Sequence, residues 1–341
     1  MENLEPNREI FNFLNPKAND LISKMNSQEL REFLNLLNNF YLEYRNILEL
    51  DQNITFGLEI EYENAKKSLI KTNINKLFGD HSWIIKLDGS LKDGEEINSP
   101  ILWDTEKTWN DLKEVCDIVN KYAEIGEKAG GHIHVGAQIL GKNYQAWKNF
   151  IKLWSVYENI IFRFTNGEYL TTRPLANKYC RVLAKKLWAN YKEINSLNLN
   201  YCELFDIMTI VNSSRNQAVN FNCVSLYHSN EVLEKNTIEF RCPNGSLNPI
   251  IWQNNVNMVI RLLEYSKSNN FDEDTLNKRH LITNDYYDSL ALYNEIYIDE
   301  ALEFCDLIFS NNLEKIYFLR QYFKSFETST KTLKRTQNFT M

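Results

Sequence analysis

The sequence lacks the cysteine pattern of a disulfide-stabilised or zinc-binding protein. Its 341 residues include six cysteines, but no two of them form a Cys-x-x-Cys pair. Scattered single cysteines are typical of reduced thiols, so we expect a cytoplasmic protein without a structural zinc site. The first residues contain no basic segment followed by an apolar run, which predicts no secretory signal. No apolar run is long enough to span a bilayer, so no membrane partner is expected.

The chain also lacks an excess of positive charge and the glycine-rich loops of common nucleotide-binding folds. Lys and Arg total 38 against 45 Asp and Glu, a net charge of −7, which argues against nucleic acid as a partner. No strand-like segment precedes a Gly-x-Gly-x-x-Gly loop, and no Gly-x4-Gly-Lys-Ser/Thr loop occurs. Neither a Rossmann site nor a P-loop is therefore predicted.

Apolar residues recur with two different periods along the chain, and this predicts an α+β protein. Hydrophobic residues make up 43% and charged residues 24% of the sequence, as in ordinary globular proteins. Helical spacing is found at 28–49, after Asp104, and at 144–164, 249–265, 274–283 and 287–325. Strands are predicted at 55–62, 83–88, 95–100, 130–136, 216–226 and 237–241. Paired strands between long helices favour a mostly antiparallel sheet covered by helices on one side.

Asn26 followed by Glu29 is a capping signal for the first amphipathic helix, which is expected to pack on the domain or, alternatively, to bind a partner. Asp104 is expected to cap the helix that follows it. Residues 165–215 are predicted to form loops and short helices, and residues 329–341 a disordered tail.

The segment Thr55-Phe56-Gly57-Leu58-Glu59-Ile60-Glu61-Tyr62 alternates between polar and apolar residues. In an extended strand, side chains two residues apart share a face, so Glu59 and Glu61 lie on one face. Two carboxylates roughly 7 Å apart repel one another unless they are solvated, protonated or bridged by a cation. The pair by itself is equally typical of a solvated strand face and of a metal site.

Two other strands repeat this arrangement. His132 and His134 lie two residues apart between glycines, where a pair of structural histidines is the alternative to a site. Glu239 and Arg241 also share a face, where a surface ion pair is the alternative. If the three strands are neighbours, one sheet face holds several carboxylates, two imidazoles and a guanidinium. Mostly oxygen ligands with one nitrogen suit Mg²⁺ or Mn²⁺, and arginine suits phosphate.

The order of these motifs resembles the amidoligase family within the glutamine synthetase and glutamate–cysteine ligase superfamily. The matching segments are Gly57-Leu58-Glu59-Ile60-Glu61, Asp88-Gly89-Ser90 with Glu96-Ile97-Asn98-Ser99-Pro100, Gly131-His132-Ile133-His134-Val135, and Thr237-Ile238-Glu239-Phe240-Arg241 with its Pro243-Asn244 continuation. The resemblance covers about 55–265. It implies a glutamine-synthetase-like core, in which a curved sheet forms a funnel that nucleotide enters at one end and the other substrates at the opposite end.

The resemblance also implies a set of site residues. Glu59 would join Asp88 and Glu96 around the metal on the acceptor side, with Glu95 as an alternative to Glu96. Glu61 would join His132 and Glu239 around the metal that binds the nucleotide phosphates. His134 would face the phosphates or the acyl group, Arg241 would contact the phosphate in transfer, and Arg215 would touch phosphate or substrate. Binding of the substrate carboxylate would fall to Arg173, Tyr179 and Arg181.

The implied activity is that of a carboxylate–amine ligase that uses ATP and two or three Mg²⁺ or Mn²⁺ ions. Glu59, His134, Arg215 and Arg241 would be catalytic, and the partners would be a small-molecule carboxylate such as a glutamate-like one, or a peptide carboxylate, and an amine. The implied organisation is a helical extension (1–52), a catalytic domain (53–268), a helical part packed on it (269–328) and the tail (329–341). The alternatives are a guanidino kinase of the same superfamily, a metal-dependent hydrolase and a non-catalytic binding module.

Overall fold

The computed structural model describes residues 25–197, 207, 211, 214–224, 235–282, 296–324 and 333–334. The helices are α3 (Ser27–Asn39), α4 (Lys67–Phe78), α5 (Glu106–Tyr122), α6 (Tyr144–Thr165), α7 (Ala176–Tyr179), α8 (Ala184–Ala189), α9 (Tyr191–Ser196), α11 (Pro249–Ser266), α12 (Glu273–Ile282), α13 (Ile298–Ile308) and α14 (Asn312–Tyr322). The strands are β1 (Phe56–Tyr62), β2 (Ile84–Lys86), β3 (Glu95–Asn98), β4 (Gly131–Gly136), β5 (Val219–Asn220), β6 (Thr237–Phe240), β7 (Ile296–Tyr297) and β8 (Leu333–Lys334).

The protein has an α+β fold built around one antiparallel sheet. Six strands follow the order β2-β3-β1-β4-β6-β5, and every neighbouring pair among them is antiparallel. The strands predicted at 55–62, 83–88, 95–100, 130–136 and 237–241 are all present, with shorter limits for several of them. The strand predicted at 216–226 is reduced to β5, and its last two residues lie outside the described part of the chain.

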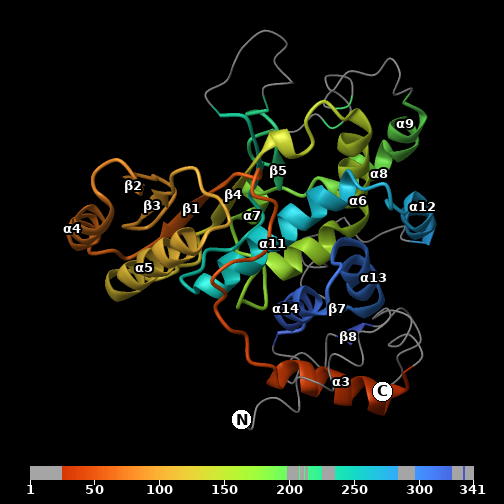
Figure 1. The fold of residues 1–341 in the computed structure, drawn as a ribbon, viewed down its shortest axis with the longest axis horizontal. Coiled ribbons are helices and arrows are strands. Elements are labelled where there is room, and N and C mark those ends of the chain that lie inside the picture. The colour runs from red at the N-terminus through yellow and green to blue at the C-terminus, as the bar shows by residue number, and fades with distance from the viewer. Residues whose placement is uncertain are drawn as a thin grey trace.

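One face of the sheet is apolar and is covered by three helices, α5, α6 and α11 (Figure 1). Phe56 of β1 stacks on Trp109 of α5, with ring centroids 5.4 Å apart. Phe240 of β6 contacts the aromatic rings of Phe150 and Trp154 on α6. Burial of these large side chains is the main source of stability for this layer. The opposite face of the sheet carries the polar side chains described below.

The first helix begins where the sequence predicts but ends ten residues earlier. Asn26 and Glu29 form a complete capping box, with the Asn26 carboxamide accepting from the Glu29 backbone N–H at 3.0 Å. The helix stops at Asn39, so the prediction that it extends to residue 49 was wrong. Beyond it, hydrogen bonds to other elements replace helical ones: the Glu43 N–H donates to the Tyr317 hydroxyl, and the Arg45 N–H to the Gln253 carboxamide.

Asp104 does not cap α5, in contrast to the prediction. Thr105 is the N-cap, and its hydroxyl accepts from the Thr108 N–H. The Asp104 carboxylate accepts from the backbone N–H groups of Leu48 and Leu50, each at 2.9 Å, and from the Trp109 indole at 2.6 Å. It therefore ties the segment that enters β1 to the first turn of α5.

Replacement of Asp104 by alanine is expected to lower the free energy of unfolding by about 3 kcal/mol, because two backbone donors and the buried Trp109 indole lose a charged acceptor. Urea unfolding followed by circular dichroism measures this loss. Asp111→Ala, which removes only a surface i,i+4 pair with Lys107, is the matched control. Equal losses in the two variants would contradict the role assigned to Asp104.

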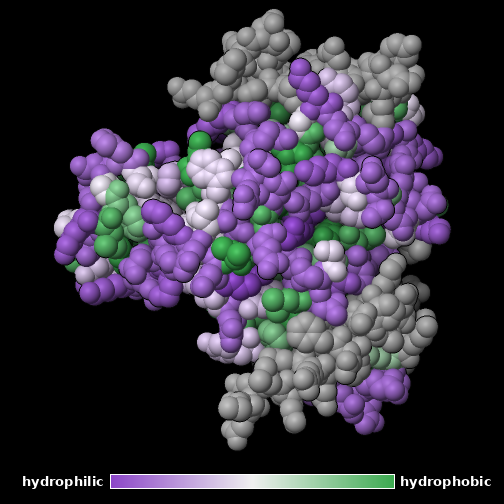
Figure 2. Space-filling model, in the orientation of Figure 1, coloured by the Kyte–Doolittle hydropathy of each residue, from purple (hydrophilic) through white to green (hydrophobic). Residues whose placement is uncertain are grey.

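The carboxyl-terminal helices α13 and α14 pack on α6 and α11, and α3 packs on α14 (Figure 1). The face drawn in Figure 2 is hydrophilic over most of its area, with hydrophobic residues in small separate areas. No helix in the described part of the chain combines the length and apolar character needed to cross a membrane. The division into 1–52, 53–268, 269–328 and 329–341 stays a prediction, and residues 329–332 and 335–341 of the tail lie outside the described residues.

Candidate functional site

The polar pairs of the three predicted strands meet on one face of the sheet. Strand β1 lies between β3 and β4, and β6 follows β4. The antiparallel register places Glu59 opposite His132, and Glu61 opposite Glu96. It also places Glu239 opposite His134. Directly opposed residues of neighbouring strands have Cβ atoms about 5 Å apart, so these side chains are in direct contact.

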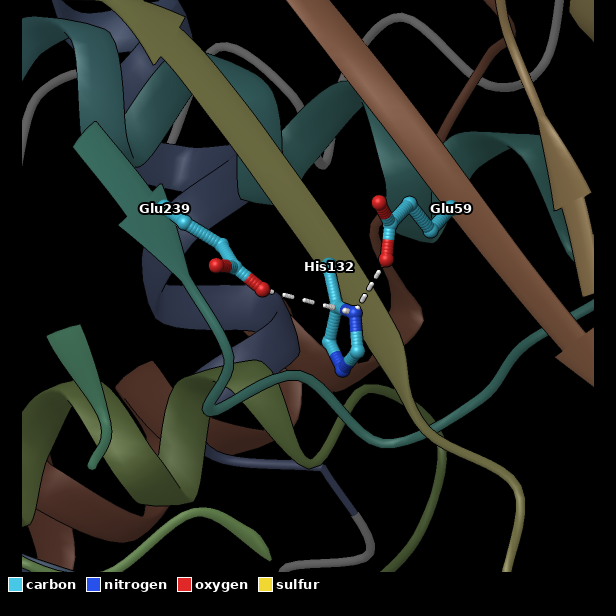
Figure 3. Close-up of side chains that lie close together, drawn as sticks. All are labelled: Glu59, His132 and Glu239. Carbon is cyan, nitrogen blue, oxygen red and sulfur yellow. Dashed lines mark hydrogen bonds and ion pairs between the residues drawn. The ribbon is translucent and has the colours of Figure 1, made fainter. Parts of the chain in front are cut away.

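His132 lies at the centre of this face, between carboxylates from two other strands. Figure 3 shows its imidazole between Glu59 and Glu239, with both carboxylates directed toward the ring. Nδ1 lies 2.6 Å from Glu59 Oε2 and 3.7 Å from Glu239 Oε1, and Nε2 lies 3.5 Å from Glu61 Oε1. The second imidazole, His134, approaches Glu59 Oε1 at 3.0 Å. These five residues, all singled out by the motifs, therefore form one contact network.

The donor atoms divide into two groups, each within 4.8 Å: Glu59 with His132 and Glu239, and Glu61 with Asp88 and Glu96. This division reverses the predicted one, in which Glu61 accompanied His132 and Glu59 accompanied Asp88. The reason is the register of β1, because Glu59 is level with His132 on β4 whereas Glu61 is level with Glu96 on β3. Alternation along one strand assigns both acids to a face but leaves open which neighbour each one meets.

The structure also distinguishes Glu96 from Glu95. Glu96 points to the site face, where it belongs to the group with Glu61 and Asp88. Glu95 points to the opposite face, where its carboxylate accepts a hydrogen bond from the Tyr62 hydroxyl at 3.2 Å and is buried. Because consecutive strand residues alternate, only one of the two can face the site.

Glu96→Gln and Glu95→Gln are expected to have different effects. Loss of the Glu96 charge removes one carboxylate of a metal-binding group, so the affinity for Mn²⁺ should fall about tenfold or more while the fold is retained. Glu95→Gln should leave Mn²⁺ affinity within twofold of wild type, because its side chain faces the core with Tyr62. Calorimetric titration with Mn²⁺ measures both effects. A larger loss of affinity in Glu95→Gln would contradict the assignment.

The charges in the network shift several pKa values. Burial alone would raise the pKa of the Glu59 carboxyl, but hydrogen bonds from His132 and His134 outweigh it and hold that pKa well below its usual range. Burial opposes the positive charge of His132, but Glu59 and Glu61 raise its pKa above the usual value. Burial and the neighbouring Glu59 raise the pKa of Glu96. The acids are thus crowded enough that a cation among them stabilises their charged forms.

Glu239 of β6 and Arg241, which follows the end of that strand, belong to the same network. The Arg241 guanidinium donates to Glu239 Oε1 and, through Nε, to the Tyr179 carbonyl at 3.2 Å. Burial would raise the pKa of the Glu239 carboxyl, but His132 and Arg241 lower it below its usual value. Glu239 Oε2 accepts from the Asn220 carboxamide at 2.6 Å. Arg241 thus lies next to the group of Glu59, His132 and Glu239 and holds one of its carboxylates in the charged form.

Two cavities meet at these groups. The first, of about 300 Å³, is lined by Glu59 and His134 together with Pro100, Ile101 and Lys235. The second, of about 460 Å³, is lined by both acids and cations. Its acids are Glu61, Asp88 and Glu239, and its cations are Lys128, Arg173, Arg215 and Arg241. The His132 network therefore separates a cavity with apolar residues from one suited to an anionic molecule.

The structure brings together most of the predicted site residues. Arg173, Tyr179, Arg215 and Arg241 line the second cavity, and His134 lines the first. Arg181 is exposed and is not among the residues lining either cavity; its guanidinium donates to the Ser214 hydroxyl at 3.3 Å. Three further residues were not singled out from the sequence: Asn98, whose carboxamide donates to Glu96 at 3.2 Å, Asn220 and Lys128. Single polar residues on short strands and loops carry no periodic signal that could have identified them.

The residues present fit a divalent cation such as Mg²⁺ or Mn²⁺. Each group offers two or three carboxylates, and only the group of Glu59 adds an imidazole nitrogen. Hard cations with octahedral coordination prefer such oxygen-rich sets, whereas structural zinc prefers thiolates and several imidazoles. The five described cysteines do not belong to either group. The donor chemistry of this face therefore agrees with the cations expected from the sequence.

Comparison with known proteins identifies one family. The sequence model of a family described as "putative amidoligase enzyme" matches residues 87–263, which include β3, β4 and β6 and therefore Asp88, Glu96, His132 and Glu239. Glu59 and Glu61 on β1 lie before the matched range, and their place in the site comes from the strand register. A search of curated proteins finds no match.

Proposed function

The chain belongs to the amidoligase family, a family of ligase-type enzymes, and from this premise we propose that it is an ATP- and Mg²⁺-dependent carboxylate–amine ligase. The observation that supports this best is the pair of three-ligand groups on one sheet face, with a different cavity on each side. Two adjacent cation sites between two substrate cavities suit the transfer of a phosphoryl group from one anionic molecule to another. We propose that the sheet and its covering helices correspond to the catalytic core of glutamine synthetase.

The two cavities receive different substrates in this proposal. ATP occupies the first cavity, where Pro100 and Ile101 offer apolar contacts to a base and Lys235 offers a positive charge to phosphates. The carboxylate substrate occupies the second cavity, where arginines and Lys128 attract an anion. Glu59, which lines the first cavity, and Glu61, which lines the second, face the point where the two substrates meet.

The reaction proceeds in two steps. An oxygen of the substrate carboxylate bonds to the γ-phosphorus of ATP as the bond to ADP breaks, which gives an acyl phosphate. The amine then bonds to the acyl carbon, inorganic phosphate leaves, and the amine loses a proton. Bound Mg²⁺ or Mn²⁺ would screen the repulsion between the carboxylate and the triphosphate.

The chain's own residues orient the reactants and balance charge. Glu59, His132 and Glu239 would hold one cation near the triphosphate, and Glu61, Asp88 and Glu96 the other near the acceptor. Arg241, fixed by Glu239 and the Tyr179 carbonyl, supplies positive charge to the phosphoryl group in transfer, and Arg215 is placed on the same cavity. His134, anchored by Glu59, faces the phosphates.

ADP release from the full-length chain tests this proposal. With Mg²⁺ and ATP, release should require both a carboxylate and an amine when pools of each are supplied. Calorimetry should show ATP binding only when Mg²⁺ is present. If ATP does not bind, the ligase proposal fails. Phosphoryl transfer to a guanidino compound without an amide product would indicate a kinase, and hydrolysis without nucleotide a metal-dependent hydrolase.

A further inference from the structure

A third cavity lies beside the site and has no role in the proposed phosphoryl transfer. It has a volume of about 250 Å³ and is formed by the loop that precedes β4 and the segment 169–174. Arg173 lines both this cavity and the second one. The third cavity is therefore a neighbour of the carboxylate-binding cavity and shares a cationic side chain with it.

Arg173 is a buried cation whose guanidinium uses only some of its N–H donors in hydrogen bonds with the described residues. Only 7% of the residue is exposed. Its guanidinium donates to the carbonyl oxygens of Pro243 and Arg241, which uses two of its five N–H donors. Within the described part of the chain, no carboxylate lies at ion-pair distance from it. A buried charge without a counterion is costly, so an anionic group bound here would be favoured.

The position of Arg173 is fixed from two sides. The Asn244 carboxamide accepts from the Arg173 N–H at 3.1 Å and donates to the Thr171 carbonyl at 3.0 Å, which holds the loop. A Cβ atom on Gly130 would lie 2.6 Å from Arg173 Cζ, so the guanidinium packs directly on the backbone there. The Gly130 N–H in turn donates to the Glu61 carboxylate. Gly130 therefore contacts both Arg173 and Glu61, a member of one candidate metal-binding group.

The same cavity also contains a negative charge and hydroxyl-bearing residues. Glu127 is exposed and lines it, together with Thr171 and Thr172. A guanidinium and a carboxylate around one small cavity match a ligand that carries both an anionic and a cationic group. The α-carboxylate and α-ammonium of an amino acid are such a pair, whereas ammonia offers no group for Arg173.

We propose that the third cavity binds the α-amino-acid end of a substrate, with Arg173 on the α-carboxylate and Glu127 on the α-ammonium. The inference rests on the proposed ligase function and adds a substrate class to it. The bound amino acid is either the acceptor, whose side-chain carboxylate reaches the second cavity, or the amine that attacks the acyl phosphate. In both cases one substrate is a free amino acid, or a molecule that keeps an unmodified α-amino-acid group, rather than an unsubstituted acid with ammonia alone.

Calorimetry on the full-length chain tests this with each of the twenty free amino acids, its N-acetyl derivative and its α-amide. Titrations are made with and without Mg²⁺ and a non-hydrolysable ATP analogue. At least one free amino acid should bind ten times more tightly than both of its derivatives. Glu127→Gln should remove the preference over the N-acetyl derivative, because it removes the partner of the α-ammonium, and Arg173→Lys should reduce the preference over the amide.

Glu114→Gln, on the exposed face of α5, is the matched control and should keep both preferences. Arg173 is buried, so its replacement can prevent folding. If Arg173→Lys fails to fold, Glu127→Gln alone tests the proposal. No preference for any free amino acid, or an unchanged preference in Glu127→Gln, would overturn the proposal even if Mg²⁺-ATP binds. Failure of the ligase proposal would instead appear as absent ATP binding.

Measurements of ADP release distinguish the two roles of the bound amino acid. If ADP is released with ammonium as the amine, the amino acid is the acceptor. If ADP is released only when a second carboxylate is added, the amino acid is the amine.

Discussion

Replacement of Glu59 by glutamine is expected to reduce ADP release at least about 100-fold while the chain remains folded. Glu59 accepts from both His132 and His134 and belongs to the group with Glu239, so it links both imidazoles to one candidate cation site. Glutamine keeps the shape but removes the negative charge that would hold a cation. The measurement is the rate of ADP release at saturating Mg²⁺, with circular dichroism to show that the fold is retained.

Two comparisons make the Glu59 result specific. Glu114→Gln removes the same charge from the exposed face of α5 and should keep the wild-type rate. Raising the Mg²⁺ concentration should recover part of the activity of Glu59→Gln if the defect is cation binding. A rate within threefold of wild type in Glu59→Gln would remove Glu59 from the catalytic site.

Arg241→Ala is expected to lower ADP release about 1,000-fold, because a guanidinium near a phosphoryl group in transfer contributes an effect of this size. It would also leave the buried Glu239 carboxylate without its arginine ion-pair partner, which removes one of the three groups that lower its pKa. Single-turnover kinetics separate this loss from weaker ATP binding, which calorimetry measures. We expect ATP affinity to change less than tenfold.

Arg241→Lys and Arg31→Ala are the matched variants for this experiment. Lysine keeps the charge but cannot donate to Glu239 and the Tyr179 carbonyl at the same time, so it should recover only part of the rate. Arg31 is exposed on α3, and its loss should have no effect. If Arg241→Ala loses ATP binding but keeps its single-turnover rate, Arg241 has a binding role and no role in transfer.

The local strand patterns could be predicted from the sequence because period-two alternation is a property of one segment. Glu59 and Glu61, His132 and His134, and Glu239 therefore lie on one face as expected. The pairing of these residues across strands could not be predicted, since it depends on register, which the alternation leaves open. This is why the two candidate metal-binding groups have Glu59 and Glu61 exchanged relative to the prediction.

Other differences arise from contacts between distant parts of the chain. The first helix ends at Asn39 although its apolar spacing continues, because Glu43 and Arg45 form hydrogen bonds with α14 and α11. Asp104 has the residue type of a cap but binds the segment before β1 instead. Lys128 reaches the second cavity from a loop, and a loop has neither the helical nor the strand periodicity from which a side chain's direction could be predicted.

Titration of the full-length chain with Mn²⁺, followed by electron paramagnetic resonance, tests the central claim most directly. The claim is that this sheet face holds two divalent cations, one at Glu59, His132 and Glu239 and one at Glu61, Asp88 and Glu96. We expect two Mn²⁺ ions per chain in the presence of a non-hydrolysable ATP analogue, and the loss of one ion in His132→Ala and of the other in Asp88→Asn. Wild-type protein that binds no Mn²⁺ under these conditions, or variants that both keep two ions, would contradict it.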